Sequence, residues 1–148
     1  MRVVVQRVKY AKVSVNDKLV GKIDAGILAL VGISSSDTRQ TTEWMANKLA
    51  NLRVFSDEEG KMNLSVSDIS GGILLIPNFT LYGETKKGFR PSYSEAAAPD
   101  FSLPYFHSFV EYMQNNYSNK IDIQSGIFGA DMQVELINDG PVTLIVEK

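Results

Sequence analysis

The stretch Met132-Gln133-Val134-Glu135-Leu136-Ile137-Asn138-Asp139-Gly140-Pro141-Val142-Thr143-Leu144-Ile145-Val146 decides how the C-terminal part of the chain folds. Two runs of strand-forming residues, 132–137 and 142–146, flank an Asp-Gly pair, which is a strong signal for a β-hairpin. A hairpin does not require the proline that follows, because proline removes a backbone donor from the ladder. An X-Pro bond is also where a cis peptide costs little. The sequence therefore predicts two paired strands with an unusual turn, and it leaves the isomer open.

The composition is typical of one soluble globular domain, which we place over residues 1–148. Apolar residues make up 44% of the chain and charged residues 22%, both ordinary values. No apolar run approaches the ~20 residues that span a bilayer. The segment 1–7 is too short and too charged for a signal peptide. The chain has no cysteine, which excludes disulfides, thiolate metal sites and a cysteine nucleophile. We expect a cytoplasmic protein that does not bind a membrane.

The charge balance limits the partners that the chain can bind. A net charge of −2 argues against a broad electrostatic grip on nucleic acid, so DNA is not an expected partner. It leaves room for a protein that holds only the end of an RNA through shape and a few contacts. The one histidine, His107, lies among apolar residues of a predicted helix, and we expect a structural role for it.

Hydrophobic patterning predicts an α+β fold with a mainly antiparallel, barrel-like sheet and two main helices. Residues 26–33 form an apolar run expected to be buried on both faces. Asp37 is the predicted N-cap of the first helix, with Gln40 completing a capping box. A loop as long as 83–99 is usually functional or disordered. The predicted helices are 38–52 and 100–117, and the predicted strands are 2–8, 11–15, 21–24, 26–33, 53–55, 73–76, 121–124, 130–137 and 142–147.

Familiar catalytic motifs are missing from the sequence. There is no Ser-His-Asp set, P-loop or zinc motif, and the acidic segment 57–59 lacks the ligand pattern of an EF-hand. We therefore expect no metal and no cofactor. Two prolines break strand rules instead: Pro77, directly before Asn78-Phe79-Thr80, and Pro141, directly after Gly140. Such breaks release backbone groups from the ladder, and released groups can form oxyanion holes and ligand clamps.

Six segments together resemble the D-aminoacyl-tRNA deacylase family over nearly the whole chain. Each segment is weak alone, but all six occur in order and at sensible separations. They are Met1-Arg2-Val3-Val4-Val5-Gln6-Arg7-Val8, Phe55-Ser56-Asp57-Glu58-Glu59-Gly60-Lys61-Met62-Asn63, Phe79-Thr80-Leu81-Tyr82, Lys87-Gly88-Phe89-Arg90-Pro91-Ser92-Tyr93, Gly129-Ala130-Asp131-Met132-Gln133-Val134 and Asn138-Asp139-Gly140-Pro141-Val142-Thr143.

The resemblance implies a homodimer that hydrolyses the ester joining a D-amino acid, or mischarged glycine, to the terminal adenosine of tRNA. In this family the Gly-Pro pair, here Gly140-Pro141, is cis and enters the active site of the partner subunit. Its two carbonyl groups hold the chiral centre of the substrate. An L-side chain would collide with them, so the wrong isomer is excluded by steric conflict.

The resemblance also implies roles for further residues. Phe79 and Thr80 line the pocket, and their amides steady the oxyanion while the ribose 2′-hydroxyl group helps to activate water. Thr80 matches a threonine once proposed as nucleophile, but a threonine without a base is a poor one, so we expect it to position the substrate. Arg7 resembles the arginine that holds the Gly-Pro carbonyls in place. Asn78 and Met132 complete the expected substrate-binding set.

One departure leaves alternatives open. The family usually has Ser-Gln where this chain has Pro77-Asn78. A related branch with proline at that position edits an L-aminoacyl-tRNA, and the altered pair also fits a non-catalytic module that binds RNA ends or nucleotides. The basic residues Lys86, Lys87 and Arg90 are candidates for contact with the tRNA acceptor end, and a solvated loop is the equal alternative.

Overall fold

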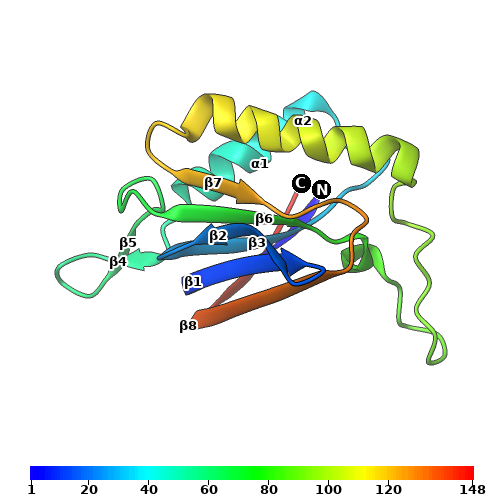
Figure 1. Cartoon of the computed structure of the whole chain (residues 1–148), viewed down its shortest axis with the longest axis horizontal. Helices are drawn as coiled ribbons and strands as arrows, with labels where there is room; N and C mark the ends of the chain where they lie inside the picture. The colour runs from blue at the N-terminus through cyan, green and yellow to red at the C-terminus, as the bar shows by residue number, and fades with distance from the viewer.

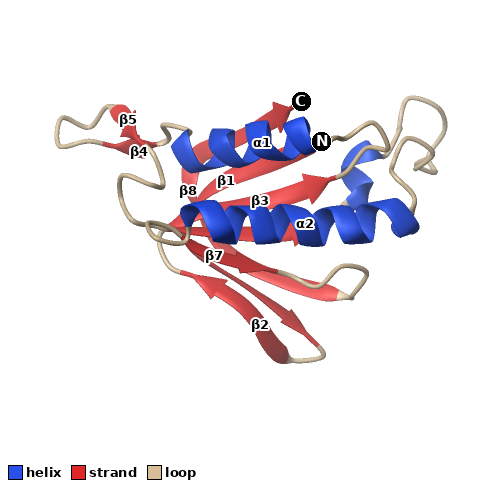
Figure 2. Ribbon diagram, turned by 90° about the horizontal axis from the view of Figure 1, so that it is seen from above, coloured by secondary structure: helices blue, strands red, loops and turns tan.

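A curved sheet of six strands forms the centre of the molecule, and two helices lie side by side across one of its faces (Figures 1 and 2). The computed structural model describes residues 1–148. The elements are β1 (Arg2–Val15), β2 (Lys18–Ile23), β3 (Gly26–Gly32), α1 (Arg39–Asn51), β4 (Phe55–Ser56), β5 (Met62–Leu64), β6 (Gly72–Pro77), the 3-10 turn η1 (Phe79–Tyr82), α2 (Pro99–Tyr117), β7 (Asp122–Ser125) and β8 (Met132–Glu147).

Strand β1 organises the sheet. It pairs antiparallel with β2, β3 and β8, and β6 and β7 continue the sheet from β3 as parallel strands. The strand order is β2-β1-β3-β6-β7, with β8 added along β1, and the short strands β4 and β5 form a separate hairpin. The predicted α+β fold, with two main helices and a mostly antiparallel, barrel-like sheet, is confirmed.

The C-terminal segment does not form the predicted hairpin. Residues 132–147 form the single strand β8, which follows β1 antiparallel from Val15 back to Arg2. Gln6 pairs with Thr143 and Val8 with Asn138, so residues 139–142 bulge out opposite Arg7. Each apolar run thus pairs with half of the 14-residue strand β1. The local hairpin prediction was wrong because this longer, non-local partner satisfies both runs.

The core lies on both faces of the sheet. Ile27, Ala29 and Val31 of β3 belong to the cluster beneath the helices, which includes Met45 of α1 and Phe106 of α2. The alternate residue Leu28 belongs to a second cluster with Val13, Leu74 and Ile76 on the opposite face. Side chains of a strand alternate between the faces, so β3 is buried on both sides, as its continuous apolar run predicts.

Strands β3 and β6 meet at two glycines. Gly26 pairs with Gly72 across the parallel ladder. A Cβ atom on Gly26 would lie 2.0 Å from the carbonyl oxygen of Gly72, and one on Gly72 would lie 2.6 Å from the side chain of Ile23. Only hydrogen fits at these positions, so the two glycines set the close approach of the strands.

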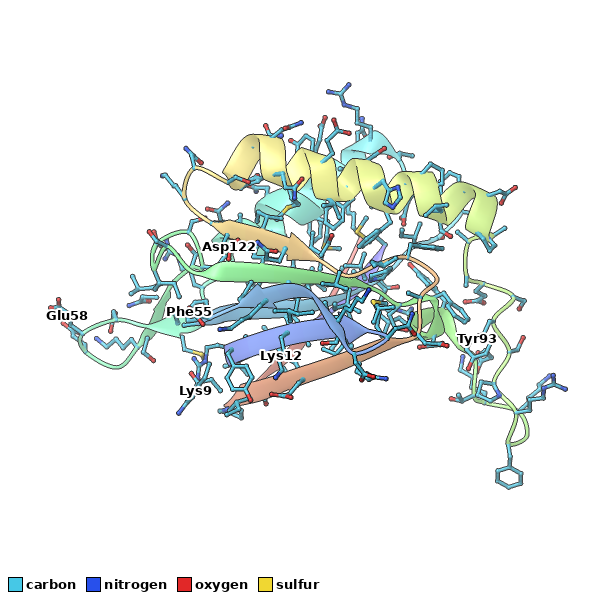
Figure 3. The ribbon with its side chains drawn as sticks, viewed as in Figure 1. Lys9, Lys12, Phe55, Glu58, Tyr93 and Asp122 are labelled. Atoms are coloured by element: carbon cyan, nitrogen blue, oxygen red, sulfur yellow. The ribbon has the colours of Figure 1, made fainter.

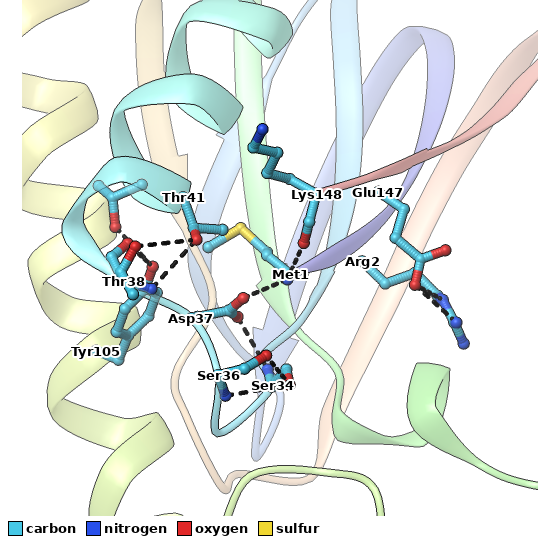
Figure 4. Close-up of polar contacts among 11 residues, drawn as sticks. Met1, Arg2, Ser34, Ser36, Asp37, Thr38, Thr41, Tyr105, Glu147 and Lys148 are labelled. Carbon is cyan, nitrogen blue, oxygen red and sulfur yellow. Dashed lines mark hydrogen bonds and ion pairs between the residues drawn. The ribbon is translucent and has the colours of Figure 1, made fainter.

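Helix α1 begins one residue later than predicted. Thr38 is its N-cap, and the Thr38 backbone N–H donates to Oγ1 of Thr41 at 3.2 Å. The predicted cap Asp37 is instead buried, where its carboxylate accepts from the amino group of Met1 and from the Ser34 backbone N–H (Figure 4). The prediction failed because this ion pair places Asp37 outside the helix. No helix of the chain combines the length and apolar character needed to cross a membrane.

Candidate active site

The carboxyl end of β6 runs directly into a one-turn helix. Pro77 is the last residue of β6, and the Asn78 backbone N–H still donates to the Val31 carbonyl at 2.8 Å. Asn78 then caps η1, because its Oδ1 accepts from the Thr80 N–H at 3.2 Å and from the Thr80 hydroxyl at 2.5 Å. The Thr80 hydroxyl therefore donates to a neutral amide oxygen, which cannot act as a base.

An apolar pocket lies beside this turn. Its volume is about 460 Å³, and it lies between η1, the segment leading into α2, and the loop after β7. The rings of Phe79 and Tyr93 meet edge to face with their centroids 5.2 Å apart. No carboxylate, imidazole or amine lines the pocket. The lining residues are Pro77, Phe79, Tyr93, Ala96, Ala97, Ala98, Pro99, Ser102, Phe128 and Gly129.

A second, more polar depression lies on the other side of Pro77. Its volume is about 340 Å³. Pro77 lines both cavities, so residues 77–79 form a ridge between them. The predicted site residues Asn78 and Met132 both line this second depression. Its lining residues are Leu30, Ile76, Pro77, Asn78, Ala130, Asp131, Met132, Gln133 and Val134.

Tyr82 fixes the end of η1 in the body of the protein. It is buried, and the guanidinium group of Arg2 lies 4.9 Å from the centre of its ring. Arg2 also donates from Nη1 to the Leu81 carbonyl at 2.9 Å. Burial raises the pKa of Tyr82 to about 12, and the nearby Arg2 opposes that rise. The phenol therefore stays neutral at ordinary pH and serves as an anchor.

The bulge in β8 presents Gly140 and Pro141 to solvent, and the peptide bond between them is cis, as the resemblance implies. The Arg7 guanidinium group donates from Nε to the Asp139 carbonyl at 3.0 Å and from Nη2 to the Gly140 carbonyl at 3.4 Å. It also bonds the Val54 carbonyl at 2.5 Å. Arg7 thus ties the bulge to the segment before β4, with only 12% of its side chain exposed.

The bulge is held from a second side. Nδ2 of Asn138 donates to the Arg7 carbonyl at 2.9 Å and to the Val142 carbonyl at 3.2 Å. The Asp139 carboxylate forms an ion pair with Arg7 at 3.0 Å. The Asn138 side chain therefore bridges the bulge to the Val142 carbonyl, and Asp139 joins it to Arg7, while Gly140 and Pro141 themselves remain uncovered.

The predicted site residues fall into two groups, one around the β8 bulge and one around η1, and these lie at opposite ends of the sheet (Figure 1). Arg7 is in register with Ile27 on β3, which is in register with Ile73 on β6, four residues before Pro77. The path from the bulge to η1 crosses from β8 through β1 and β3 to β6, which is three strand spacings, and then follows β6 for four residues. The two sites are therefore on the order of 20 Å apart. One chain therefore does not bring Gly140, Pro141 and Arg7 together with Phe79 and Thr80.

The comparison with known proteins decides the family. Residues 4–147 match the family model described as D-Tyr-tRNA(Tyr) deacylase. The chain belongs to this family. A relative from Geobacillus sp. (strain WCH70), named D-aminoacyl-tRNA deacylase, is 54% identical over 147 residues, which are 99% of this chain and 95% of the relative. The family resemblance drawn from the six sequence segments is confirmed.

Two solved structures share the fold. One, named "c-Myc DNA Unwinding Element Binding Protein", is 41% identical with a TM-score of 0.91 and covers 100% of this chain and 99% of its own. The other, named "Structural Analysis of a probable eukaryotic D-amino acid tRNA deacylase", has a TM-score of 0.84 at 17% identity, covering 98% of this chain and 97% of its own. The second likeness concerns the fold alone.

The sequence motifs from which we predicted the site residues of this deacylase-family chain did not include part of the pocket wall. Phe79 lines the apolar pocket as expected, whereas the contributions of Ala96, Ala97 and Phe128 were not predicted. The sequence signal that could have revealed this part of the wall was Tyr93, the last residue of the Lys-Gly-Phe-Arg-Pro-Ser-Tyr segment. Tyr93 brings the long loop back to Phe79. His107 is exposed on α2 and lines neither cavity.

Proposed function

We propose that this protein hydrolyses the ester bond of D-aminoacyl-tRNA, and of mischarged glycyl-tRNA, and that two copies of the chain complete each active site. The observation that supports this proposal best is the division of the site. The apolar pocket and η1 lie at one end of the sheet, and the exposed Gly140-Pro141 bulge lies at the other. A second copy can bring its bulge to the pocket of the first.

The two cavities suit the two parts of the substrate. The apolar pocket has a volume within the usual range for small-molecule sites, and its aromatic walls Phe79, Tyr93 and Phe128 suit the base of the terminal adenosine. The polar depression beyond Pro77 suits the aminoacyl group. This arrangement places the scissile ester on the ridge formed by residues 77–79.

The chemistry uses water rather than a protein nucleophile. The Thr80 hydroxyl donates to Asn78, and no base lines the apolar pocket; the one carboxylate that borders either cavity, that of Asp131, lines the polar depression. In the proposed mechanism the 2′-hydroxyl group of the terminal ribose assists in activating water, as the family resemblance implies. The Thr80 amide also donates to Asn78, which leaves the neighbouring Phe79 amide as the donor that steadies the oxyanion. A backbone donor aimed at developing charge is an effective source of rate enhancement.

Chiral selection comes from the partner subunit. Arg7 and Asn138 hold the bulge in one shape, so the carbonyl groups of Gly140 and Pro141 meet the substrate as fixed obstacles that an L-side chain would strike. Strand β8 also suits a dimer interface. It is bonded to β1 along one edge, and its Ile137, Leu144 and Ile145 are exposed, a pattern that favours association.

Hydrolysis of D-Tyr-tRNA and L-Tyr-tRNA tests the proposed reaction. We expect release of D-tyrosine and no release of L-tyrosine beyond the spontaneous rate. Preferential release of L-tyrosine would support the editing alternative motivated by Pro77. Tight binding of a non-hydrolysable aminoacyl-adenosine without release from either substrate would support a binding module instead.

Mixing two inactive variants tests the shared site. Phe79→Ala removes a wall of the apolar pocket, and Gly140→Trp places a bulky side chain on the exposed β8 bulge. An added Cβ atom at Gly140 has no neighbouring atom closer than 3.7 Å, so this replacement should leave the fold intact. Equal refolding of both gives mixed dimers with one intact site, and about a quarter of wild-type activity should return for random pairing of a two-fold dimer. A mixture that stays inactive, while each variant is folded and dimeric, would contradict a site shared between subunits.

A further inference from the structure

The tip of the loop between η1 and α2 exposes an aromatic ring that the chain itself leaves uncovered. Phe89 has a relative exposure of 108%, and every residue from Thr85 to Glu95 is exposed. The loop projects from the body beyond η1 (Figure 1). A fully exposed phenylalanine at a loop tip gains nothing from packing within its own chain, so both faces of its ring are free to stack on a partner.

The loop presents its tip on a defined neck. Glu84 and Ser92 exchange backbone hydrogen bonds of 2.7 and 3.0 Å, and Gly88 turns the chain at the tip with φ +66°, a value that glycine adopts readily. Beyond the neck, Tyr93 joins the wall of the apolar pocket (Figure 3). Phe89 is four residues from Tyr93, which sets its reach at no more than roughly 14 Å.

The tip is also cationic in an acidic protein, and the two glutamates nearest to it, Glu84 and Glu95, lie at the base of the loop. Residues 85–94 include Lys86, Lys87 and Arg90 and no acidic residue, whereas the whole chain carries a net charge of −2. The Lys86 ammonium group lies 3.5 Å from the Glu84 carboxylate. Lys87 and Arg90 make no ion pair, so these two cations beside Phe89 remain available to an anionic partner.

We propose that this tip binds the unpaired nucleotides that precede the terminal adenosine of tRNA, with Phe89 stacked on a base and Lys87 and Arg90 at the phosphates. The proposal rests on the proposed function, because the apolar pocket must hold the terminal adenosine. A reach of roughly 14 Å corresponds to about four stacked nucleotides at 3.4 Å each. Unpaired RNA suits this surface because its bases offer their faces to aromatic side chains, whereas a duplex hides them.

Substrates of three lengths test the stacking contact. D-Tyr-tRNA, a minihelix with the same unpaired 3′ end, and 3′-D-tyrosyl-adenosine are compared for the wild type and Phe89→Ala. We expect kcat/KM to fall by about fivefold or more for the two RNAs, the size of a lost base–aromatic stack. The loss should be absent for the adenosine ester, which does not reach the tip.

Two replacements and one control separate stacking from general apolar contact. Phe89→Trp should retain kcat/KM on both RNAs, whereas Phe89→Leu should lose it, because leucine has no ring to stack. Leu19→Ala removes an apolar side chain of β2 that is 59% exposed and should match the wild type on all three substrates.

Several outcomes would overturn the proposal. Unchanged kcat/KM for Phe89→Ala on the RNAs would rule out the stacking interaction, and an equal loss on the adenosine ester would place Phe89 in the pocket. A change in sedimentation coefficient on Phe89→Ala would make the tip a contact between protein subunits. Failure of the proposed function is distinct from these, since the wild type would then cleave none of the substrates.

Salt dependence tests the cations separately. Binding of a non-hydrolysable aminoacyl-minihelix is measured against salt concentration for Lys87→Ala, Arg90→Ala and Lys86→Ala. Removing one cation from a phosphate of single-stranded RNA should lower the slope of log K against log salt by about 0.7. We expect this decrease for Lys87 and Arg90 and a smaller one for Lys86, whose charge Glu84 partly offsets. Slopes equal to the wild type would refute the proposed binding of phosphates.

Discussion

Asn78 and Pro77 have structural roles that account for their presence at the site edge. Asn78 accepts two hydrogen bonds from Thr80 and so shapes η1, a local capping role that asparagine fills well. Pro77 ends β6 and forms the ridge between the two cavities. The departure from the family's Ser-Gln therefore retains a well-formed turn beside the pocket.

Thr80 provides the first prediction at this scale. Thr80→Val should lower kcat by no more than about tenfold, because it removes one hydrogen bond to Asn78 and no reacting group. Loss of a catalytic nucleophile would instead cost several orders of magnitude. Single-turnover hydrolysis of D-Tyr-tRNA measures the difference, and Thr80→Ser, which keeps the hydroxyl group, should match the wild type. A loss of about 10⁴-fold in Thr80→Val would restore the nucleophile hypothesis.

Arg7 provides the second prediction. Arg7→Lys keeps the charge but loses the planar set of donors that reaches the carbonyls of Asp139, Gly140 and Val54. We expect kcat/KM on D-Tyr-tRNA to fall by roughly 10-fold or more, as for loss of charged hydrogen bonds. The exposed Arg39→Lys, on α1, is the matched control and should have no effect. Equal kcat/KM in Arg7→Lys and wild type would show that Arg7 does not hold the bulge.

At the scale of elements, the sequence predicted those that depend on local pattern. The two helices were predicted to within about one residue at each end, because apolar periodicity is a local signal. The cap of α1 was assigned to Asp37 rather than Thr38, because the ion pair of Asp37 with the chain terminus is not local. Strand β8 was predicted as a hairpin because the Asp139-Gly140 signal is local, whereas its pairing with β1 joins the two ends of the chain. The walls of the apolar pocket from 96–98 and 128–129 were missed for the same reason: only the tertiary fold brings them to Phe79.

The glycine contact between β3 and β6 gives a prediction about stability. Gly26→Ala would place a methyl group against the Gly72 backbone, so the strands must separate. We expect the free energy of unfolding to fall by about 3 kcal/mol, the upper part of the usual range for overpacking. Urea denaturation measures this loss. Gly140→Ala, with no atom closer than 3.7 Å to its Cβ atom, should unfold like the wild type. Unchanged stability in Gly26→Ala would mean that the strands can separate without cost.

At the scale of the whole molecule, the sheet carries the pocket at one end and the bulge at the other. This separation follows from the register of four strands, and no single motif in the sequence reveals it. The motifs identified the residues of the site, whereas only the fold showed that one chain holds them apart. The dimer was implied by family resemblance alone and gains a geometric reason from this separation.

A charge introduced on the exposed face of β8 tests whether the active site requires a dimer. Ile145→Glu replaces a side chain that is 70% exposed in the single chain, so the fold should survive while an apolar interface is lost. We expect a monomer in sedimentation and no hydrolysis of D-Tyr-tRNA. Met62→Glu, at 57% exposure on β5, should remain dimeric and active. An active monomer of Ile145→Glu would show that one chain holds a complete site.

Because the pocket and the bulge of one active site come from different chains in the proposed dimer, dimerisation and substrate binding are thermodynamically coupled. A substrate that touches the pocket of one chain and the bulge of another binds the pair more tightly than either chain alone, and by linkage it strengthens their association by the same factor. On dilution below the dissociation constant of the pair, the rate per chain should fall in proportion to protein concentration, and excess substrate should delay that fall. The cell could then set this activity through the abundance of the chain as well as through its turnover.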